Sequence, residues 1–138
     1  MKIKMATIHT KYLGELRTKA IHVKSGNELI TDAPVDNKGQ GEYFSPTDLL
    51  ATALGSCMIT IAGQAGYTHG FSVDDTTIDI TKIMASNPRR VAEVTVELNF
   101  PKKPYTEKQK EIIRVACLNC PVAKSLHSEI KQSVVFNF

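Results

Sequence analysis

Residues 44–66, FSPTDLLATALGSCMITIAGQAG, are the stretch that decides the fold. Ser45 offers a capping hydroxyl, and Pro46 follows at a position where a missing N–H costs nothing. Asp48 adds an acid in the first turn, where the helix dipole favours negative charge. We therefore predict that a helix begins at Pro46.

The helix predicted here is almost without charge, since residues 49–73 contain no Asp, Glu, Lys or Arg. A helix with so little polar surface is normally buried, so we expect it at the centre of the domain. A membrane span is the alternative, because spans need about 20 apolar residues. We disfavour it because three glycines weaken the helix and a polar stripe dilutes it, formed by Thr52, Ser56, Thr60 and Gln64.

Length and composition indicate one ordinary globular domain over residues 1–138, with 42% hydrophobic and 22% charged residues. The net charge of +3 is carried by scattered lysines, which gives a nucleic-acid role little support. No apolar targeting core follows Met1, so we expect a soluble cytoplasmic protein. Three cysteines without a secretion signal suggest free or catalytic thiols in a reducing compartment.

Apolar periodicity on either side of the central helix predicts strands and shorter helices. A capping box at Thr106 should open one further helix, and Cys120 should cap another that has Pro121 at its first position. The order is βββ, α, ββ, αα, β, which indicates an α+β fold with antiparallel sheets and helices covering one side. The expected strands are 2–10, 15–24, 28–31, 73–83, 91–100 and 133–138.

Cys57 lies about three turns into the central helix, too far from its positive end for the dipole to favour a thiolate. If Cys57 is reactive, a nearby cation must stabilise the thiolate, and Arg17 on the second strand is the best candidate because its planar fork stays charged. The alternatives are that Cys57 is a small core residue and that Arg17 only solubilises a strand.

Cys120 differs from Cys57 because a helix cap brings its sulfur close to free N–H groups, which favours the thiolate. Together with Cys117 it forms a C-x-x-C, so a zinc site or a thioredoxin-type pair is a further hypothesis. A cysteine hydrolase is another, with His69 or His127 as the base for Cys57. Neither the spacing of the histidines nor a local signature supports these readings.

Two motifs together resemble the OsmC/Ohr family of osmotically inducible and organic hydroperoxide resistance proteins. They are SPTDLLATALGSCM at residues 45–58 and CPVAKSL at residues 120–126, and the likeness in element order spans nearly the whole chain. The resemblance implies that Cys57 is the peroxidatic thiol, that Cys120 resolves it, and that Arg17 activates the thiolate. It also implies an OsmC-like fold, an intertwined homodimer and a dithiol reductant that is lipoyl-linked in some members.

The resemblance agrees with a hydroperoxide reductase that needs no metal or organic cofactor. An organic hydroperoxide would be the preferred substrate, since an apolar pocket is expected from Leu50, Leu54, Met58 and Ile61. One departure concerns the position after the motif proline, where the hydroperoxide resistance branch has a glutamate that holds the arginine. Here that position is Thr47, and Asp48 follows about 100° further around the helix. Asp48 either substitutes for the glutamate or only caps the helix. A capping role would favour the alternative hypothesis, a non-catalytic protein that binds a hydrophobic or thiol-reactive ligand.

Overall fold

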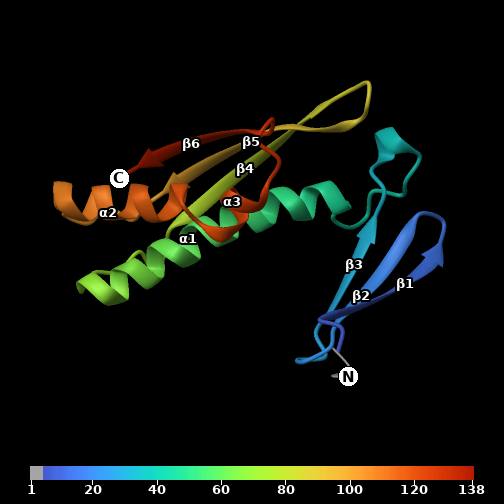
Figure 1. Cartoon of the computed structure of the whole chain (residues 1–138), viewed down its shortest axis with the longest axis horizontal. Helices are drawn as coiled ribbons and strands as arrows, with labels where there is room; N and C mark the ends of the chain where they lie inside the picture. Colours follow the sequence, from blue (N-terminus) through green and yellow to red (C-terminus); the bar gives the residue numbers. More distant parts are fainter. Residues whose placement is uncertain (1–4) are drawn as a thin grey trace. The chain divides into compact units, whose positions relative to one another are not determined.

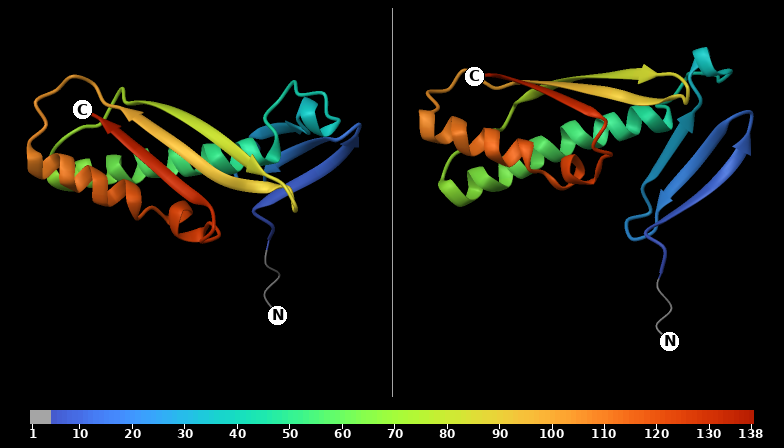
Figure 2. Two further views of the ribbon diagram at one scale, coloured as in Figure 1. Left: turned by 90° about the horizontal axis from the view of Figure 1, so that it is seen from above. Right: turned by 45° about the horizontal axis from the view of Figure 1, so that its top comes forward.

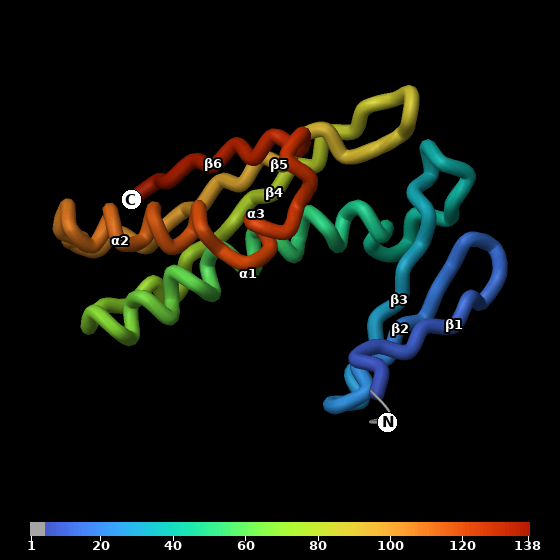
Figure 3. Tube along the Cα trace, viewed as in Figure 1, coloured from blue at the N-terminus to red at the C-terminus, as the bar shows by residue number. Residues whose placement is uncertain are grey.

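The computed structural model describes residues 5–138, and its elements follow the expected order (Figures 1 and 3). The chain forms two compact units, Met1–Leu49 and Leu50–Phe138. The elements are β1 (Ile8–Gly14), β2 (Arg17–His22), β3 (Glu28–Asp32), the short 3₁₀ helix η1 (Val35–Asn37), α1 (Pro46–His69), β4 (Thr77–Ala85), β5 (Arg90–Asn99), α2 (Glu107–Leu118), α3 (Pro121–Ser125) and β6 (Lys131–Asn137).

The first unit is the expected antiparallel meander, in the order β1-β2-β3. The first strand starts later than the predicted 2–10, of which residues 2–4 lie outside the described part. It continues to Gly14 because residues beyond the alternating stretch still pair with β2. Glu15 and Leu16 then form the tight connection with φ of 51° and 61°, the positive values that two-residue hairpin turns require.

The second unit contains a three-stranded sheet in the order β4-β5-β6, with α1 and α2 on the same face (Figure 2). β4 and β5 form the expected antiparallel hairpin, whereas β6 runs parallel to β5. The prediction of purely antiparallel sheets is therefore corrected in this detail. The reason is topological: α2 and α3 form a crossover that returns the chain to the edge where β5 begins.

The core of the second unit lies between this sheet and the helices. β5 contributes every second residue, Val94, Val96 and Leu98, as its alternation predicted. A bulge near Ala92 disturbs the pattern, so that Val91 is the buried residue at the start of the strand. The helices contribute Leu54, Met58, Ala62, Ile113 and Cys117.

Helix α1 begins at Pro46 as predicted, and it buries one stripe rather than its whole circumference. The buried residues recur at helical spacing and are Ala51, Leu54, Gly55, Met58, Ala62 and Gly66. Gly55 permits the close approach to β4, since a Cβ there would lie 2.4 Å from the Ile80 Cδ1 atom. By length and composition α1 could cross a membrane, but core helices of soluble proteins pass the same test.

The caps of the two shorter helices are also as predicted. Thr106 and Gln109 form a reciprocal capping box at 3.1 and 3.0 Å, which fixes the start of α2. Cys120 is the N-cap of α3 and Pro121 occupies its first turn. Local sequence signals thus place the segment that carries Cys117 and Cys120.

Candidate functional site

Three free thiols gather in the second unit, one from each of its helical elements. Cys57 projects from the third turn of α1 and is half-buried, whereas Cys117 and Cys120 are completely buried. Burial and, after it, the neighbouring Cys57 raise the pKa of the Cys120 thiol. The structure therefore brings together the two cysteines that the sequence singled out.

The Cys120 sulfur also caps α3, accepting a hydrogen bond from the Ala123 N–H at 3.4 Å. This contact and that of the Val122 N–H favour the thiolate, as expected for a cap. Burial outweighs them, and together with Cys57 it raises the pKa of the Cys120 thiol above its ordinary value. The cap contacts thus favour the thiolate as the sequence predicted, but desolvation of the cap outweighs them.

Cys117 occupies the last turn of α2 and faces α1. Its Sγ donates a hydrogen bond to the Met58 carbonyl oxygen at 3.5 Å. Burial, followed by the nearby Cys120, raises the pKa of Cys117 to about 12. Cys117 is thus a protonated thiol at neutral pH and not a nucleophile.

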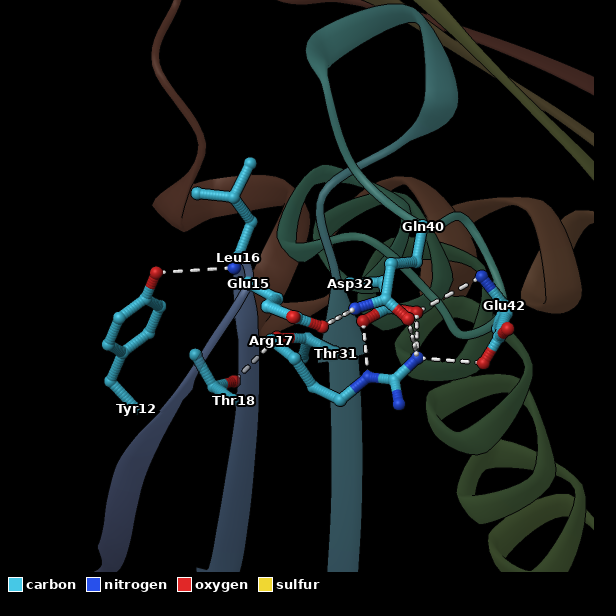
Figure 4. A network of polar contacts seen from close by, with 9 residues as sticks. All are labelled: Tyr12, Glu15, Leu16, Arg17, Thr18, Thr31, Asp32, Gln40 and Glu42. Atoms are coloured by element: carbon cyan, nitrogen blue, oxygen red, sulfur yellow. Dashed lines mark hydrogen bonds and ion pairs between the residues drawn. The ribbon is translucent and has the colours of Figure 1, made fainter.

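Arg17 lies in the first unit, at the start of β2, within a dense network of polar contacts (Figure 4). Its Nε and Nη2 atoms donate to the two carboxylate oxygens of Asp32 at 2.7 and 2.9 Å. Nη2 also donates to Glu42 at 2.8 Å and to Gln40 at 3.1 Å, and the guanidinium lies 4.9 Å from the centre of the Tyr43 ring. The arginine is therefore fixed on several sides.

Asp32 is the centre of this network. It is completely buried and also accepts a hydrogen bond from the Glu42 N–H at 3.1 Å. The Arg17 guanidinium, followed by the backbone N–H groups of Glu42 and Tyr43, holds the pKa of Asp32 below its usual value. The carboxylates of Asp32 and then Glu42 raise the pKa of Arg17, so Arg17 and Asp32 are both charged over the whole physiological range.

Sequence reasoning missed Asp32, Gln40 and Glu42 as partners of Arg17. The hairpin register contained a signal, since extending the pairing away from the Ser25–Asn27 turn places Arg17 opposite Asp32. The polar segment 34–42 gave no comparable signal, because its contact with Arg17 depends on how the loop folds back. It is this fold that brings Glu42 to the strand pair.

Asp48 caps α1. Its carboxylate accepts from the Ser45 N–H at 2.8 Å, while the Ser45 hydroxyl accepts from the Asp48 N–H at 3.0 Å. This reciprocal pair is the capping arrangement that the sequence offered as one of two possibilities. The carboxylates that accept hydrogen bonds from the Arg17 guanidinium, at 2.7–2.9 Å, are those of Asp32 and Glu42.

The remaining candidate residues are less closely connected to the thiols. His69 and His127 are both exposed, and His127 accepts a hydrogen bond from the Glu129 N–H at 3.1 Å. Within residues 5–138 no three His, Cys, Asp or Glu side chains are grouped as metal ligands would be. Leu54 and Met58 have no exposed surface, so they belong to the core and do not line an open pocket as expected.

The geometry defines an α+β protein with a pair of contacting thiols, one on a long central helix and one at a helix cap. Its sequence matches the profile of the OsmC-like protein family over residues 39–135, well over half of the chain. The chain therefore belongs to the OsmC-like family, and the resemblance seen in its two motifs is confirmed. A comparison with curated proteins finds no match.

Solved structures support this assignment. A Psychrobacter arcticus 273-4 protein, named for a proposed role in osmotic stress and detoxification, is 48% identical, with a TM-score of 0.93 over 99% of this chain and 98% of that chain. An organic hydroperoxide resistance protein OsmC from Legionella pneumophila shares the fold at 13% identity, with a TM-score of 0.76 over 99% of this chain and 100% of that one. A Vibrio cholerae protein, named for a proposed role in organic hydroperoxide resistance and with captopril bound in one of its active sites, is 14% identical and has a TM-score of 0.74 over 98% of this chain and 94% of that chain.

Proposed function

We propose that this protein is a thiol-dependent reductase of organic hydroperoxides, with Cys57 as the peroxidatic thiol and Cys120 as the resolving thiol. The observation that carries the proposal is that the side chains of Cys57 and Cys120 are close enough for Cys57 to affect the ionisation of Cys120. A sulfenic acid formed at Cys57 would have a thiol partner already in contact. Membership in a family with hydroperoxide resistance proteins supports the same chemistry.

In the first step the Cys57 thiolate attacks the outer oxygen of the hydroperoxide. An S–O bond forms, the O–O bond breaks, and the alkoxide takes a proton and leaves as an alcohol. The thiolate is oxidised to a sulfenic acid and the peroxide is reduced. Cys57 is only half-buried in α1, so part of the residue is open to a small substrate.

In the second step Cys120 attacks the Cys57 sulfenic acid. An S–S bond forms, the S–O bond breaks, and hydroxide leaves as water with the Cys120 proton. The raised pKa of Cys120 keeps it from competing for the peroxide, and its proton leaves with the hydroxide as the S–S bond forms. An external dithiol, lipoyl-linked in some relatives, then returns two electrons and restores both thiols.

Arg17 provides the positive charge in this proposal, and Asp32 holds its guanidinium in one orientation. A guanidinium that donates from Nε and Nη2 to one buried carboxylate has few rotamers left, so its position is preorganised. Asp48 serves the same site indirectly, by fixing the start of the helix that carries Cys57.

The working form is proposed to be a homodimer. Only 33% of the most apolar 18-residue window of α1 is buried by this chain. A second copy would cover the rest of that apolar surface. Analytical ultracentrifugation at micromolar concentration should give twice the chain mass of 15.2 kDa, and a monomer there would contradict the dimer.

The decisive experiment is single-turnover oxidation of the reduced protein by cumene hydroperoxide and by hydrogen peroxide, with thiols counted after denaturation. Wild type should lose two thiols rapidly and prefer the organic peroxide. Cys57→Ser should be slower by at least about a thousandfold, because a serine hydroxyl is not ionised at neutral pH. Cys120→Ser should still form a sulfenic acid, which a dimedone adduct detects. Thiol loss no faster than that of free cysteine would refute the activity.

A non-catalytic ligand-binding protein is the second candidate. The capping contact of Asp48 favours it, because capping is the one of the two possible roles of this residue that points to a binding protein. The captopril in the Vibrio cholerae relative shows that a small thiol compound binds in that protein's active site. Calorimetric titration with captopril, using the Cys57→Ser variant to exclude exchange chemistry, separates binding from turnover.

A further inference from the structure

Cys117 is a buried thiol that the proposed reaction does not use. It lies in the last turn of α2, and only Leu118 and Asn119 separate it from Cys120. Its backbone carbonyl accepts a hydrogen bond from the Cys120 N–H at 3.5 Å. The backbone of Cys117 thus contacts Cys120, which leaves its side chain free to contact another element.

The side chain reaches across to α1 at the turn that carries Cys57. Its Sγ donates to the carbonyl oxygen of Met58, the residue directly after Cys57, at 3.5 Å. Cys117, Met58 and Cys120 are all completely buried. A side-chain contact therefore joins the α2–α3 connection to the helix next to the proposed peroxidatic residue.

Such a contact matters most for the distance between Cys57 and Cys120. Cys120 caps α3, a helix of only five residues, which is too short to be stable by itself. A shift of the α2–α3 connection along α1 would separate the two sulfurs, and disulfide formation tolerates little displacement.

We propose that Cys117 is a positioning residue for the Cys57–Cys120 pair. Its S–H bond to the Met58 carbonyl holds the α2–α3 connection against α1, so that the resolving sulfur stays in contact with Cys57. For its catalytic consequence the inference rests on the proposed function. For the geometry it requires only that the two thiols form a disulfide.

Three variants separate hydrogen bonding from packing. Cys117→Ser keeps a donor but is smaller and polar, Cys117→Val keeps apolar volume but has no donor, and Cys117→Ala has neither. In stopped-flow oxidation by cumene hydroperoxide, sulfenic acid formation should be unchanged in all three. Disulfide formation should slow by about threefold to tenfold in the Val and Ala variants, as loss of one weak hydrogen bond predicts, and stay within about twofold of wild type in Cys117→Ser.

Over-oxidation gives an independent readout, because a slower second step leaves the sulfenic acid exposed to another peroxide. Mass spectrometry should therefore find more sulfinic acid at Cys57 in Cys117→Val than in wild type at equal peroxide. Ile113→Val is the matched control, since it trims a completely buried side chain of the same helix and leaves the sulfur contact intact. It should not alter the second step.

The proposal fails if folded Cys117→Val and Cys117→Ala form the disulfide as fast as wild type. It also fails if Cys117→Val is normal while Cys117→Ser is slow, because that order is the one that packing alone predicts. If no variant reacts with peroxide, the proposed function is wrong, and equilibration in glutathione buffers tests the positioning separately. There, Cys117→Val should require a more oxidising buffer than wild type for half-formation of the Cys57–Cys120 disulfide.

Discussion

The two units of the molecule hold their functional groups by different forces. In the first unit, Arg17 is fixed by charged hydrogen bonds of 2.7–2.9 Å to the carboxylates of Asp32 and Glu42. In the second unit, Cys117 and Cys120 are fixed by burial and by sulfur hydrogen bonds of 3.4–3.5 Å. The difference indicates that the first arrangement should respond to charge, pH and salt, and the second to changes in side-chain volume.

The largest effect should come from removing the charge of the first unit and measuring the reactivity of the second. Arg17→Met should slow sulfenic acid formation at Cys57 by about tenfold to a hundredfold, because preorganised positive charge stabilises the thiolate and the transition state. Arg17→Lys keeps the charge but cannot donate from two atoms to Asp32, so it should recover only part of the rate. Stopped-flow kinetics with cumene hydroperoxide provide the measurement. An unchanged rate in Arg17→Met would show that the two units act independently.

A change in volume should affect the second unit next most strongly. In Gly66→Ala, the new Cβ would lie 2.5 Å from the backbone oxygen of Phe71, which cannot move aside as a side chain could. We expect a loss of about 1–3 kcal/mol in the free energy of unfolding. Urea denaturation followed by circular dichroism measures it.

Gly63→Ala is the matched control on the same helix. A Cβ at Gly63 would meet only the Val73 Cγ2 atom at 3.8 Å, an ordinary contact. The better helix propensity of alanine should then stabilise the protein by up to about 1 kcal/mol. If both alanine variants changed stability in the same direction, the packing explanation would be wrong.

Acid should disturb the first unit through Asp32. Because Arg17 lowers the pKa of Asp32, the carboxylate adds stability that is complete above its ordinary pKa of about 4. This contribution is lost as the pH falls through the lowered pKa. In NMR spectra, the Glu42 amide, which donates to Asp32, should show a shift change below about pH 4 in wild type that is larger than in Asp32→Asn. A wild-type transition above pH 5 would contradict the lowered pKa, and Asp36→Asn, on the exposed η1 turn, is the control.

The smallest effect is expected for Glu42. Its carboxylate is 64% exposed, so its pair with Arg17 is screened by solvent and salt. Glu42→Gln should change the hydrogen exchange of the Arg17 Nε–H by less than about threefold, and raising the salt concentration should remove most of that difference. An effect as large as that of Asp32→Asn would show that the exposed pair matters as much as the buried one.

The sequence was informative wherever the signal was local. Ser45, Pro46 and Thr106 mark helix starts through side chains that act within one turn, and the alternation of Val94, Val96 and Leu98 reports one sheet face. These signals, together with the family motifs, were enough to predict the α+β order and to place Cys57 and Cys120.

The remaining features depend on contacts between distant segments. Arg17 and Glu42 meet only after the loop folds back, and the parallel pairing of β6 depends on where the crossover returns the chain. The raised pKa of the Cys120 thiol follows from burial, which outweighs the local effect of the cap. Local rules identified the favourable cap contacts, but they contain no information about desolvation.

The parallel pairing of β5 and β6 has a consequence for the order of folding. Glu93 is paired with Lys131, and the whole segment with α2 and α3 lies in the loop that this pairing closes. Closing such a loop is entropically costly, so contacts of this sequence separation are expected to form late. Cys120 lies within that loop and Cys57 lies before it. The two thiols should therefore come into contact only when the sheet is complete, and the ability to form their disulfide would report that the second unit has finished folding.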